Sequence, residues 1–133
     1  MAKESTRTGI LLFAHGSSLD DANRGVHELA SQVAARGPYS YVRAAFLERA
    51  RPDLPEAVAQ AVEAGIRRVI VIPYFLTLGR HLQRDLPALI APLRHKYPEV
   101  VIDVGQALEG HPLMSSIILG RVQEVMAGDK TTQ

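Results

Sequence analysis

The chain has 133 residues, of which 47% are hydrophobic and 22% charged, as is typical of a single globular domain with a sizeable core. A formal net charge of +1 excludes a strongly basic field for nucleic acid or an anionic membrane surface. The absence of cysteine excludes disulfides, thiolate catalysis and cysteine-ligated metal centres. Any metal site must therefore use the five histidines and the fourteen acidic residues.

The terminal residues and the longest apolar run of the chain indicate where in the cell the protein is expected. The residues before Gly9 are polar and lack the apolar stretch of a signal peptide. The longest apolar run, Val69 to Leu76, is far too short to span a bilayer. These features predict a cytoplasmic protein with no membrane or nucleic-acid partner. We expect a flexible tail over residues 1–8, one α/β domain over 9–127 and a second tail over 128–133.

Apolar runs alternate with helical patterns along the whole chain. The first half predicts a strand, a helix, a second strand and a helix opened by a capping box, over Gly9–Ala14, Asp20–Arg36, Tyr41–Leu47 and from Asp53 to Gly65. The second half predicts the same alternation over Arg67–Phe75, Asp85–Tyr97, Val100–Val104 and Pro112–Met126. Pro92 should kink or break its helix. The alternation predicts a three-layer α/β sandwich, in which helices flank a four-stranded parallel sheet.

Candidate site residues follow the strands. His15 comes directly after the first strand, Glu48 after the second, His81 in the loop after the third and His111 after the fourth. Ligand crevices of open parallel sheets lie beyond the carboxyl ends of the strands, so all four residues are expected at one edge. Gly16 beside His15 permits a close backbone approach.

Each of these residues also has a purely structural interpretation. Glu48 and His81 fit an exposed loop as well as a site, and His111 fits the cap of its helix better than a direct role. Ser17 or Ser18 is expected to cap the helix that follows His15. The two remaining histidines fall within predicted helices, where we expect structural or neutral roles: His27 and His95.

Arginines supply a second signal. Arg80 and Arg84 flank His81, so basic groups gather near the predicted crevice. A basic rim around imidazole and carboxylate groups suits a ligand with several carboxylates around a metal chelator. It suits a phosphorylated ligand equally well, and the residues alone leave both open.

Short motifs along the chain resemble a known family. They are FAHGS from Phe13, FLE from Phe46, PYFL from Pro73, GRH from Gly79 and DLP from Asp85. In this order they resemble class II tetrapyrrole chelatases, especially the short, single-domain sirohydrochlorin cobaltochelatases and ferrochelatases. The resemblance runs from about Gly9 to Val125.

The resemblance implies insertion of a divalent metal, Co²⁺ first, into sirohydrochlorin on the route to cobalamin or sirohaem. It implies that His15 and His81 hold the metal and that the acidic Glu48 assists. The metal is then a substrate, and no cofactor is permanently bound. Long relatives place two copies of the fold around one cleft, so this shorter chain is expected to form a homodimer.

We expect His15 and His81 to bind the metal transiently and to accept the two pyrrole protons, since neutral imidazole suits Co²⁺, Ni²⁺ and Fe²⁺. Arg80 and Arg84 would pair with substrate carboxylates, and Ser17 and Leu78 would lie on the substrate side.

Three alternatives remain open. The first is an iron or nickel chelatase that acts on the same or an amidated sirohydrochlorin. The second is a metal- or tetrapyrrole-binding protein without turnover. The third is a phosphate-ligand module built on Gly16-Ser17-Ser18 at a helix N-terminus, which the shortness of that loop disfavours.

Overall fold

A computed structural model describes residues 7–128. Four strands alternate with four helices in this part of the chain, as predicted. The first four elements are β1 (Thr8–Ala14), α2 (Asp20–Arg36), β2 (Tyr41–Phe46) and α3 (Leu54–Glu63). The last four are β3 (Arg68–Pro73), α4 (Arg80–Lys96), β4 (Val101–Val104) and α5 (Met114–Met126). No helix among the described residues is long and apolar enough to cross a bilayer.

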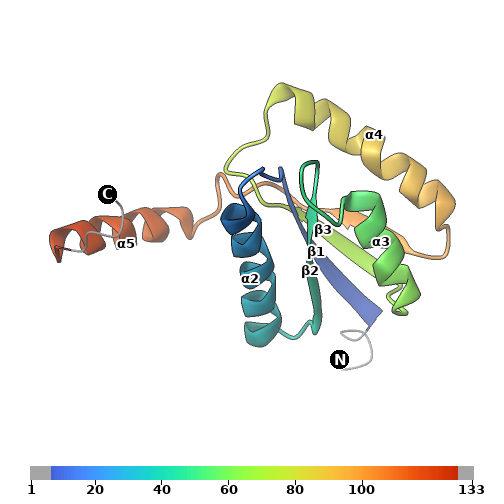
Figure 1. Cartoon of the computed structure of the whole chain (residues 1–133), viewed down its shortest axis with the longest axis horizontal. Coiled ribbons are helices and arrows are strands. Elements are labelled where there is room, and N and C mark those ends of the chain that lie inside the picture. The colour runs from blue at the N-terminus through green and yellow to red at the C-terminus, as the bar shows by residue number, and fades with distance from the viewer. Residues whose placement is uncertain (1–6, 129–133) are drawn as a thin grey trace.

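The strands form one parallel sheet in the order β2-β1-β3-β4. Helix α2 covers one face, and α3 and α4 cover the other, which confirms the predicted three-layer sandwich (Figure 1). All seven residues of the central strand β1 are buried, because helices pack on both of its faces. Parallel pairing brings the carboxyl ends of all four strands to one edge of the sheet.

Two apolar clusters stabilise the three layers. Alternate residues of a strand point to opposite faces, so β1, β2 and β3 contribute to both clusters, whereas β4 contributes only to the cluster under α3 and α4. Phe13, Val71 and Ile102 belong to the cluster under α3 and α4, and Leu12 and Phe46 belong to the cluster under α2. This arrangement leaves the loops at the carboxyl edge on a well-packed base.

Helix α4 differs from its prediction. It begins at Arg80 and not at Asp85, and it continues through both Pro87 and Pro92. Neither proline breaks the helix, because the carbonyls that they leave without a donor belong to exposed residues, Gln83 and Ala88, and can be hydrated. His81 therefore lies in the first turn of a helix and not in a loop.

Helix α5 stands apart from the sandwich. Its bounds agree with the prediction to within two residues, but none of its residues is buried. Figure 1 shows α5 extending away from the sheet instead of packing on it. Most of the predicted terminal tails lie outside the described residues, although β1 already begins at Thr8.

Candidate metal-insertion site

The loops after β1 and β2 are joined by their backbones. The Leu47 amide donates to the Ala14 carbonyl at 2.9 Å, and the Glu48 amide donates to the His15 carbonyl at 3.1 Å. These bonds continue the pairing of the two strands for two residues beyond their ends. His15 and Glu48 are therefore held side by side by the backbone itself.

Gly16 makes this close approach possible. Its φ of +93° lies in the region that favours glycine. A Cβ on Gly16 would lie 1.7 Å from the Glu48 carbonyl oxygen, which no side chain can do without moving the backbone. The glycine is thus required by the backbone of the residue that supplies the carboxylate.

The backbone also sets the tautomer of His15. Its Nδ1 lies 3.1 Å from the Gly16 carbonyl oxygen, which can only accept a hydrogen bond, so Nδ1 carries the proton and donates. In the neutral ring the lone pair is then on Nε2. That nitrogen faces the Glu48 carboxylate, with 3.6 Å between Nε2 and Oε2.

Two acceptors that face each other need a cation between them. Ligand distances of about 2.1 Å and a tetrahedral angle place neighbouring ligand atoms about 3.4 Å apart. The 3.6 Å between His15 Nε2 and Glu48 Oε2 is close to this spacing. The side chains are 57% and 53% exposed, so an ion from solution can reach them. This pair can act as two ligands of one divalent metal, or share a proton.

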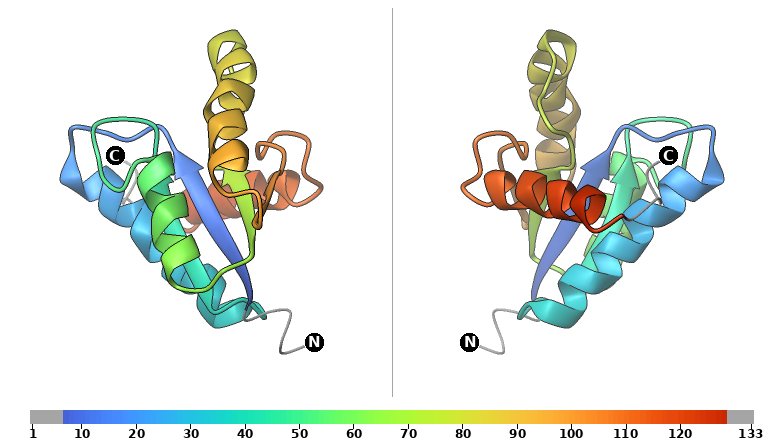
Figure 2. Two further views of the ribbon diagram at one scale, coloured as in Figure 1. Left: turned by 90° about the vertical axis from the view of Figure 1, so that its right-hand side faces the viewer. Right: turned by 90° about the vertical axis from the view of Figure 1, so that its left-hand side faces the viewer.

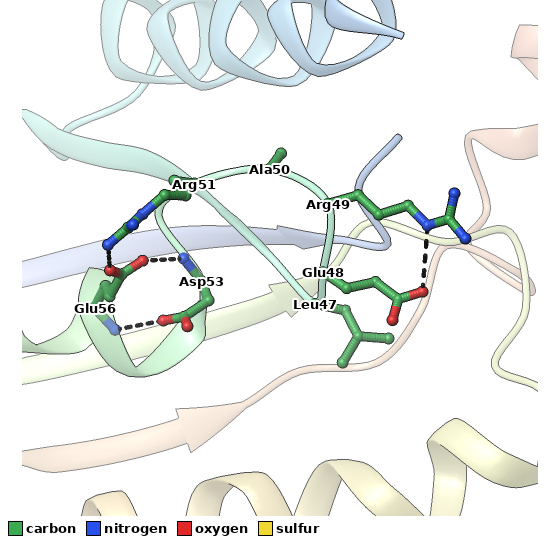
Figure 3. Close-up of a pocket in the computed structure, with 7 residues that line it drawn as sticks. All are labelled: Leu47, Glu48, Arg49, Ala50, Arg51, Asp53 and Glu56. Atoms are coloured by element: carbon green, nitrogen blue, oxygen red, sulfur yellow. Dashed lines mark hydrogen bonds and ion pairs between the residues drawn. The ribbon is translucent and has the colours of Figure 1, made fainter. Parts of the chain in front are cut away.

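The loop between β2 and α3 borders an open hollow of about 410 Å³ (Figure 3). Glu48 and Arg49 lie on one side of this loop, where the Arg49 Nε is 3.8 Å from the Glu48 Oε2. Arg49 has a positive φ of 66°, which an arginine rarely adopts. Arg51 lies on the other side and pairs with Glu56.

The capping box predicted at the start of α3 is present. Asp53 accepts a hydrogen bond from the Glu56 amide, and Glu56 accepts one from the Asp53 amide, both at 2.9 Å. The bond from the Asp53 backbone, followed by the bond from the Arg51 side chain, lowers the pKa of the Glu56 carboxyl. The loop that carries Glu48 is thereby fixed at its far end.

His81 and Arg84 lie on helix α4, apart from the loops that carry His15 and Glu48. The first turn of α4 projects beyond the loops that follow β1 and β2 (Figure 2). Arg84, one turn along the helix, lies 3.4 Å from His81 through Nη2 and Nδ1. A guanidinium only donates, so in this contact Nδ1 of His81 accepts. Arg80 and Arg84 are both exposed.

Leu78 lines a second hollow, of about 290 Å³, between the start of α4 and the end of β4. Its other walls are mainly apolar and include Leu86, Ile90 and Val104. A contact between Leu78 and the substrate stays a prediction.

The structure brings only part of the predicted site together. His15 and Glu48 are in contact, whereas the side chain of His81 contacts Arg84. Within residues 7–128, no three histidine, aspartate or glutamate side chains converge on a possible metal position. A shared metal between His15 and His81 therefore stays a prediction.

The remaining histidines occupy structural positions. The His111 Nδ1 accepts a hydrogen bond from the Leu113 amide at 3.1 Å, but Leu113 is itself the N-cap of α5 and the helix has no side-chain cap, so the expected capping role of His111 is wrong. His27 packs its ring on Phe46, with 5.4 Å between the ring centroids. His95 lies in the last turn of α4.

The expectation that Ser17 or Ser18 caps α2 is wrong. The N-cap is Leu19, without a side-chain bond, because the Ser17 hydroxyl accepts from the Leu19 amide at 3.0 Å and so stabilises the bend before the helix. Sequence reasoning also missed Asn23. Its side chain accepts from the Ser17 amide at 2.9 Å and donates to the Ser17 carbonyl at 2.8 Å. An asparagine in the first turn of a helix was the available signal.

The comparisons with known proteins fit this fold. The CbiX family model matches residues 9–125, and the chain belongs to this family of class II chelatases. A sirohydrochlorin cobaltochelatase from Methanopyrus kandleri is 35% identical, over 88% of this chain and 96% of the relative. One from Methanococcoides burtonii is 29% identical, over 92% and 99%. A chloroplastic sirohydrochlorin ferrochelatase from Arabidopsis thaliana is 29% identical over 90% of this chain, which spans 53% of that protein.

Solved structures share the architecture. The crystal structure described as a putative cobalamin biosynthesis CbiX protein from Marinobacter aquaeolei has a TM-score of 0.80 and 30% identity, over 90% of this chain and 98% of that one. The sirohydrochlorin chelatase SirB from Bacillus subtilis, solved with cobalt, has a TM-score of 0.81 at 22% identity. This chain covers 51% of SirB, and at that identity the likeness supports the fold alone.

Proposed function

We propose that this protein inserts a divalent metal, Co²⁺ first, into sirohydrochlorin. The observation that carries the proposal is the His15–Glu48 pair, whose facing acceptors are spaced as neighbouring ligands of one metal. Two relatives that match over nearly their whole length are named sirohydrochlorin cobaltochelatases, which favours Co²⁺. The ferrochelatase relative supports the same reaction with iron as the second candidate.

Metal insertion needs three things from the protein. The ion must lose water, the macrocycle must lose two pyrrole protons, and the ion must then leave the protein for the ring. Few protein ligands and a neutral imidazole favour this last step, because they hold Co²⁺ or Fe²⁺ without enclosing it. Once the metal moves to the ring, the lone pair of His15 Nε2 and the Glu48 carboxylate are free to take protons.

We propose that the residues at the start of α4 form a second half of the site, which recognises the macrocycle, whereas His15 and Glu48 form the first half. Arg80 and Arg84 would pair with its carboxylates, His81 would complete the metal transfer and accept the second proton, and Leu78 would contact the ring. Ser17, whose backbone is fixed by Asn23, would border the same space. A cytoplasmic location and the lack of a permanently bound cofactor stay predictions.

We propose that the working unit is a homodimer. The Arabidopsis and Bacillus chelatases are about twice as long as the segment that matches this chain. The methanogen relatives, by contrast, are matched over nearly their full length. A second copy of this chain would supply the other half of a cleft for a flat macrocycle.

The test is insertion of Co²⁺, Fe²⁺ and Ni²⁺ into sirohydrochlorin in separate assays, each followed by the change in the tetrapyrrole absorption spectrum. We expect turnover with the wild-type chain, fastest with Co²⁺. His15→Ala and His81→Ala should lose at least about a hundredfold in rate with an unchanged circular dichroism spectrum. His95→Ala is the matched control, because His95 lies at the far end of α4.

Two outcomes would overturn the proposal. Tight binding of the tetrapyrrole without a spectral change for any metal would indicate a binding protein. Wild-type rates in both His15→Ala and His81→Ala would remove the two histidines from the mechanism.

A further inference from the structure

Arg49 has a backbone conformation that is unfavourable for an arginine. Within residues 7–128 it is the only residue other than glycine with a positive φ, which is 66°. Glycine and asparagine are the residues that usually adopt this conformation. The chain reverses direction here, because the Phe46 amide donates to the Pro52 carbonyl at 2.9 Å and closes the loop. An arginine at such a turn calls for an explanation in what its side chain does.

The Arg49 side chain reaches the Glu48 carboxylate. Its Nε lies 3.8 Å from the Glu48 Oε2 (Figure 3), and this is the same oxygen that faces the Nε2 of His15 at 3.6 Å. Both charged side chains are more than half exposed, and an ion pair as exposed as this adds little to stability. The pair therefore does not explain the unfavourable φ. The charge that Arg49 places beside the site explains it better.

This charge acts on any cation that Glu48 holds. With a neutral His15 ring, Glu48 carries one negative charge and Arg49 one positive charge, so the three groups are neutral together. A divalent ion between the Nε2 of His15 and the Oε2 of Glu48 is repelled by the guanidinium beside that oxygen. In water, such repulsion across about 5 Å corresponds to roughly a tenfold loss of affinity.

We propose that Arg49 is a positioning residue for metal release, which acts through Glu48 by weakening the hold of this carboxylate on the ion. The ion must leave the protein for the macrocycle, so tight binding before the transfer lowers the turnover number. Arg49 thus leaves the first half of the site able both to bind the ion and to lose it. This inference rests on the proposed metal role of His15 and Glu48.

Arg51 provides a matched control in the same loop. It carries the same charge as Arg49 but lies on the opposite side of the loop, where it pairs with Glu56 (Figure 3). Arg49→Asn and Arg51→Asn therefore remove the same charge from the chain, but only Arg49→Asn removes it from beside Glu48. Arg49→Lys is a second control, because it keeps the charge.

The first experiment measures Co²⁺ binding to the metal-free protein by titration calorimetry, without sirohydrochlorin. We expect Arg49→Asn to bind Co²⁺ about tenfold more tightly than the wild type does. Arg49→Lys and Arg51→Asn should bind it as the wild type does. Equal or weaker binding by Arg49→Asn would overturn the proposal, and so would the same tightening in either control.

His15→Ala in the same titration separates the failure of this inference from that of the proposed function. If His15→Ala binds Co²⁺ as tightly as the wild type, the ion is held elsewhere and both are wrong. If His15→Ala loses the ion but Arg49→Asn does not hold it more tightly, only the role of Arg49 is wrong.

The second experiment asks whether Arg49 serves the fold instead. Asparagine adopts a positive φ more readily than arginine, so Arg49→Asn should unfold at the same urea concentration as the wild type or at a higher one. A lower urea midpoint would show that the arginine stabilises the loop, contrary to the argument from its φ.

The third experiment measures turnover with saturating Co²⁺ and varied sirohydrochlorin. In Arg49→Asn the turnover number should fall about three- to tenfold, with an unchanged KM for sirohydrochlorin. An unchanged turnover number would contradict a role in release. A raised KM with wild-type turnover would show that Arg49 binds a carboxylate of the macrocycle instead.

Discussion

The two halves of the candidate site are built in different ways. His15 and Glu48 follow neighbouring strands and are joined by backbone hydrogen bonds of 2.9 and 3.1 Å that extend the sheet. His81 and Arg84 instead lie on one turn of α4, which projects beyond the edge. The first half depends on long-range packing, whereas the second depends on a single helix.

This difference has a chemical consequence. The carbonyl of Gly16 fixes the tautomer of His15 and leaves the lone pair of Nε2 toward Glu48. The Nδ1 of His81 accepts from an exposed arginine at 3.4 Å, a contact at the long limit of a hydrogen bond. We infer that the first half is preorganised for the metal and that the second adjusts when the macrocycle arrives.

The largest effect is expected from one added methyl group. Gly16→Ala should destabilise the fold by roughly 3 kcal/mol and abolish metal insertion, because the methyl group collides with the Glu48 carbonyl at an unfavourable φ. Gly79→Ala is the matched control: a Cβ there meets nothing within 4 Å, so the loss should stay below about 1 kcal/mol. Urea unfolding measures both. Equal losses of stability in the two variants would show that the backbone at Gly16 accepts a side chain as readily as the backbone at Gly79.

The next effect separates the roles of the two halves. Glu48→Gln removes the charge that faces His15, so we expect the turnover number to fall about ten- to a hundredfold with little change in KM for the macrocycle. Arg84→Gln should instead raise KM for the carboxylated macrocycle with a smaller effect on turnover. Steady-state kinetics over a range of sirohydrochlorin concentrations test this. A reversed pattern would exchange the assignments of the two halves.

The sequence predicted the order of the elements and the carboxyl-edge location because these follow from local patterns. Apolar runs and the Asp53–Glu56 capping box are visible in short windows, and parallel pairing then brings the strand ends to one edge. The collision that requires glycine at position 16 involves Glu48, 32 residues further along the chain, and no local pattern contains it.

Two errors have local causes. The start of α4 was placed too late because two prolines and Gly79 resemble a loop, although the freed carbonyls are exposed. Serine is a common N-cap residue, so Ser17 or Ser18 was expected to cap α2. The bonds between the Asn23 side chain and the Ser17 backbone, which fix Ser17 before the helix, were not anticipated. The isolation of α5 was not predicted, because the apolar residues of a helix predict that it packs on a surface but do not show which one.

A smaller effect on stability is expected from changes at the N-caps of α3 and α4, the helices that follow Glu48 and carry His81. Asp53→Ala removes the side-chain cap of α3 and should cost about 1 kcal/mol. Gly79→Ser adds a hydroxyl at the N-cap of α4, which has no side-chain cap, and should gain a few tenths of a kcal/mol. Thermal unfolding of the two variants compares them. An unchanged melting temperature in Asp53→Ala would show that the capping box does not stabilise the loop that carries Glu48.

The smallest effect is a dependence on pH that belongs to the first half only. The Asp53 amide and Arg51 lower the pKa of Glu56 below its ordinary value of 4.5, so near that pH the unfolded chain binds more protons than the folded one. The stability from Glu56 is therefore fully present above pH 4.5 and is lost as the pH falls through the lowered pKa. Glu56→Gln keeps an acceptor for the Asp53 amide but cannot titrate, so its stability should fall less steeply between about pH 5 and pH 3. Urea midpoints measured across this range compare the slopes. Parallel curves for the two chains would show that the loop carrying Glu48 is held without the charge of Glu56.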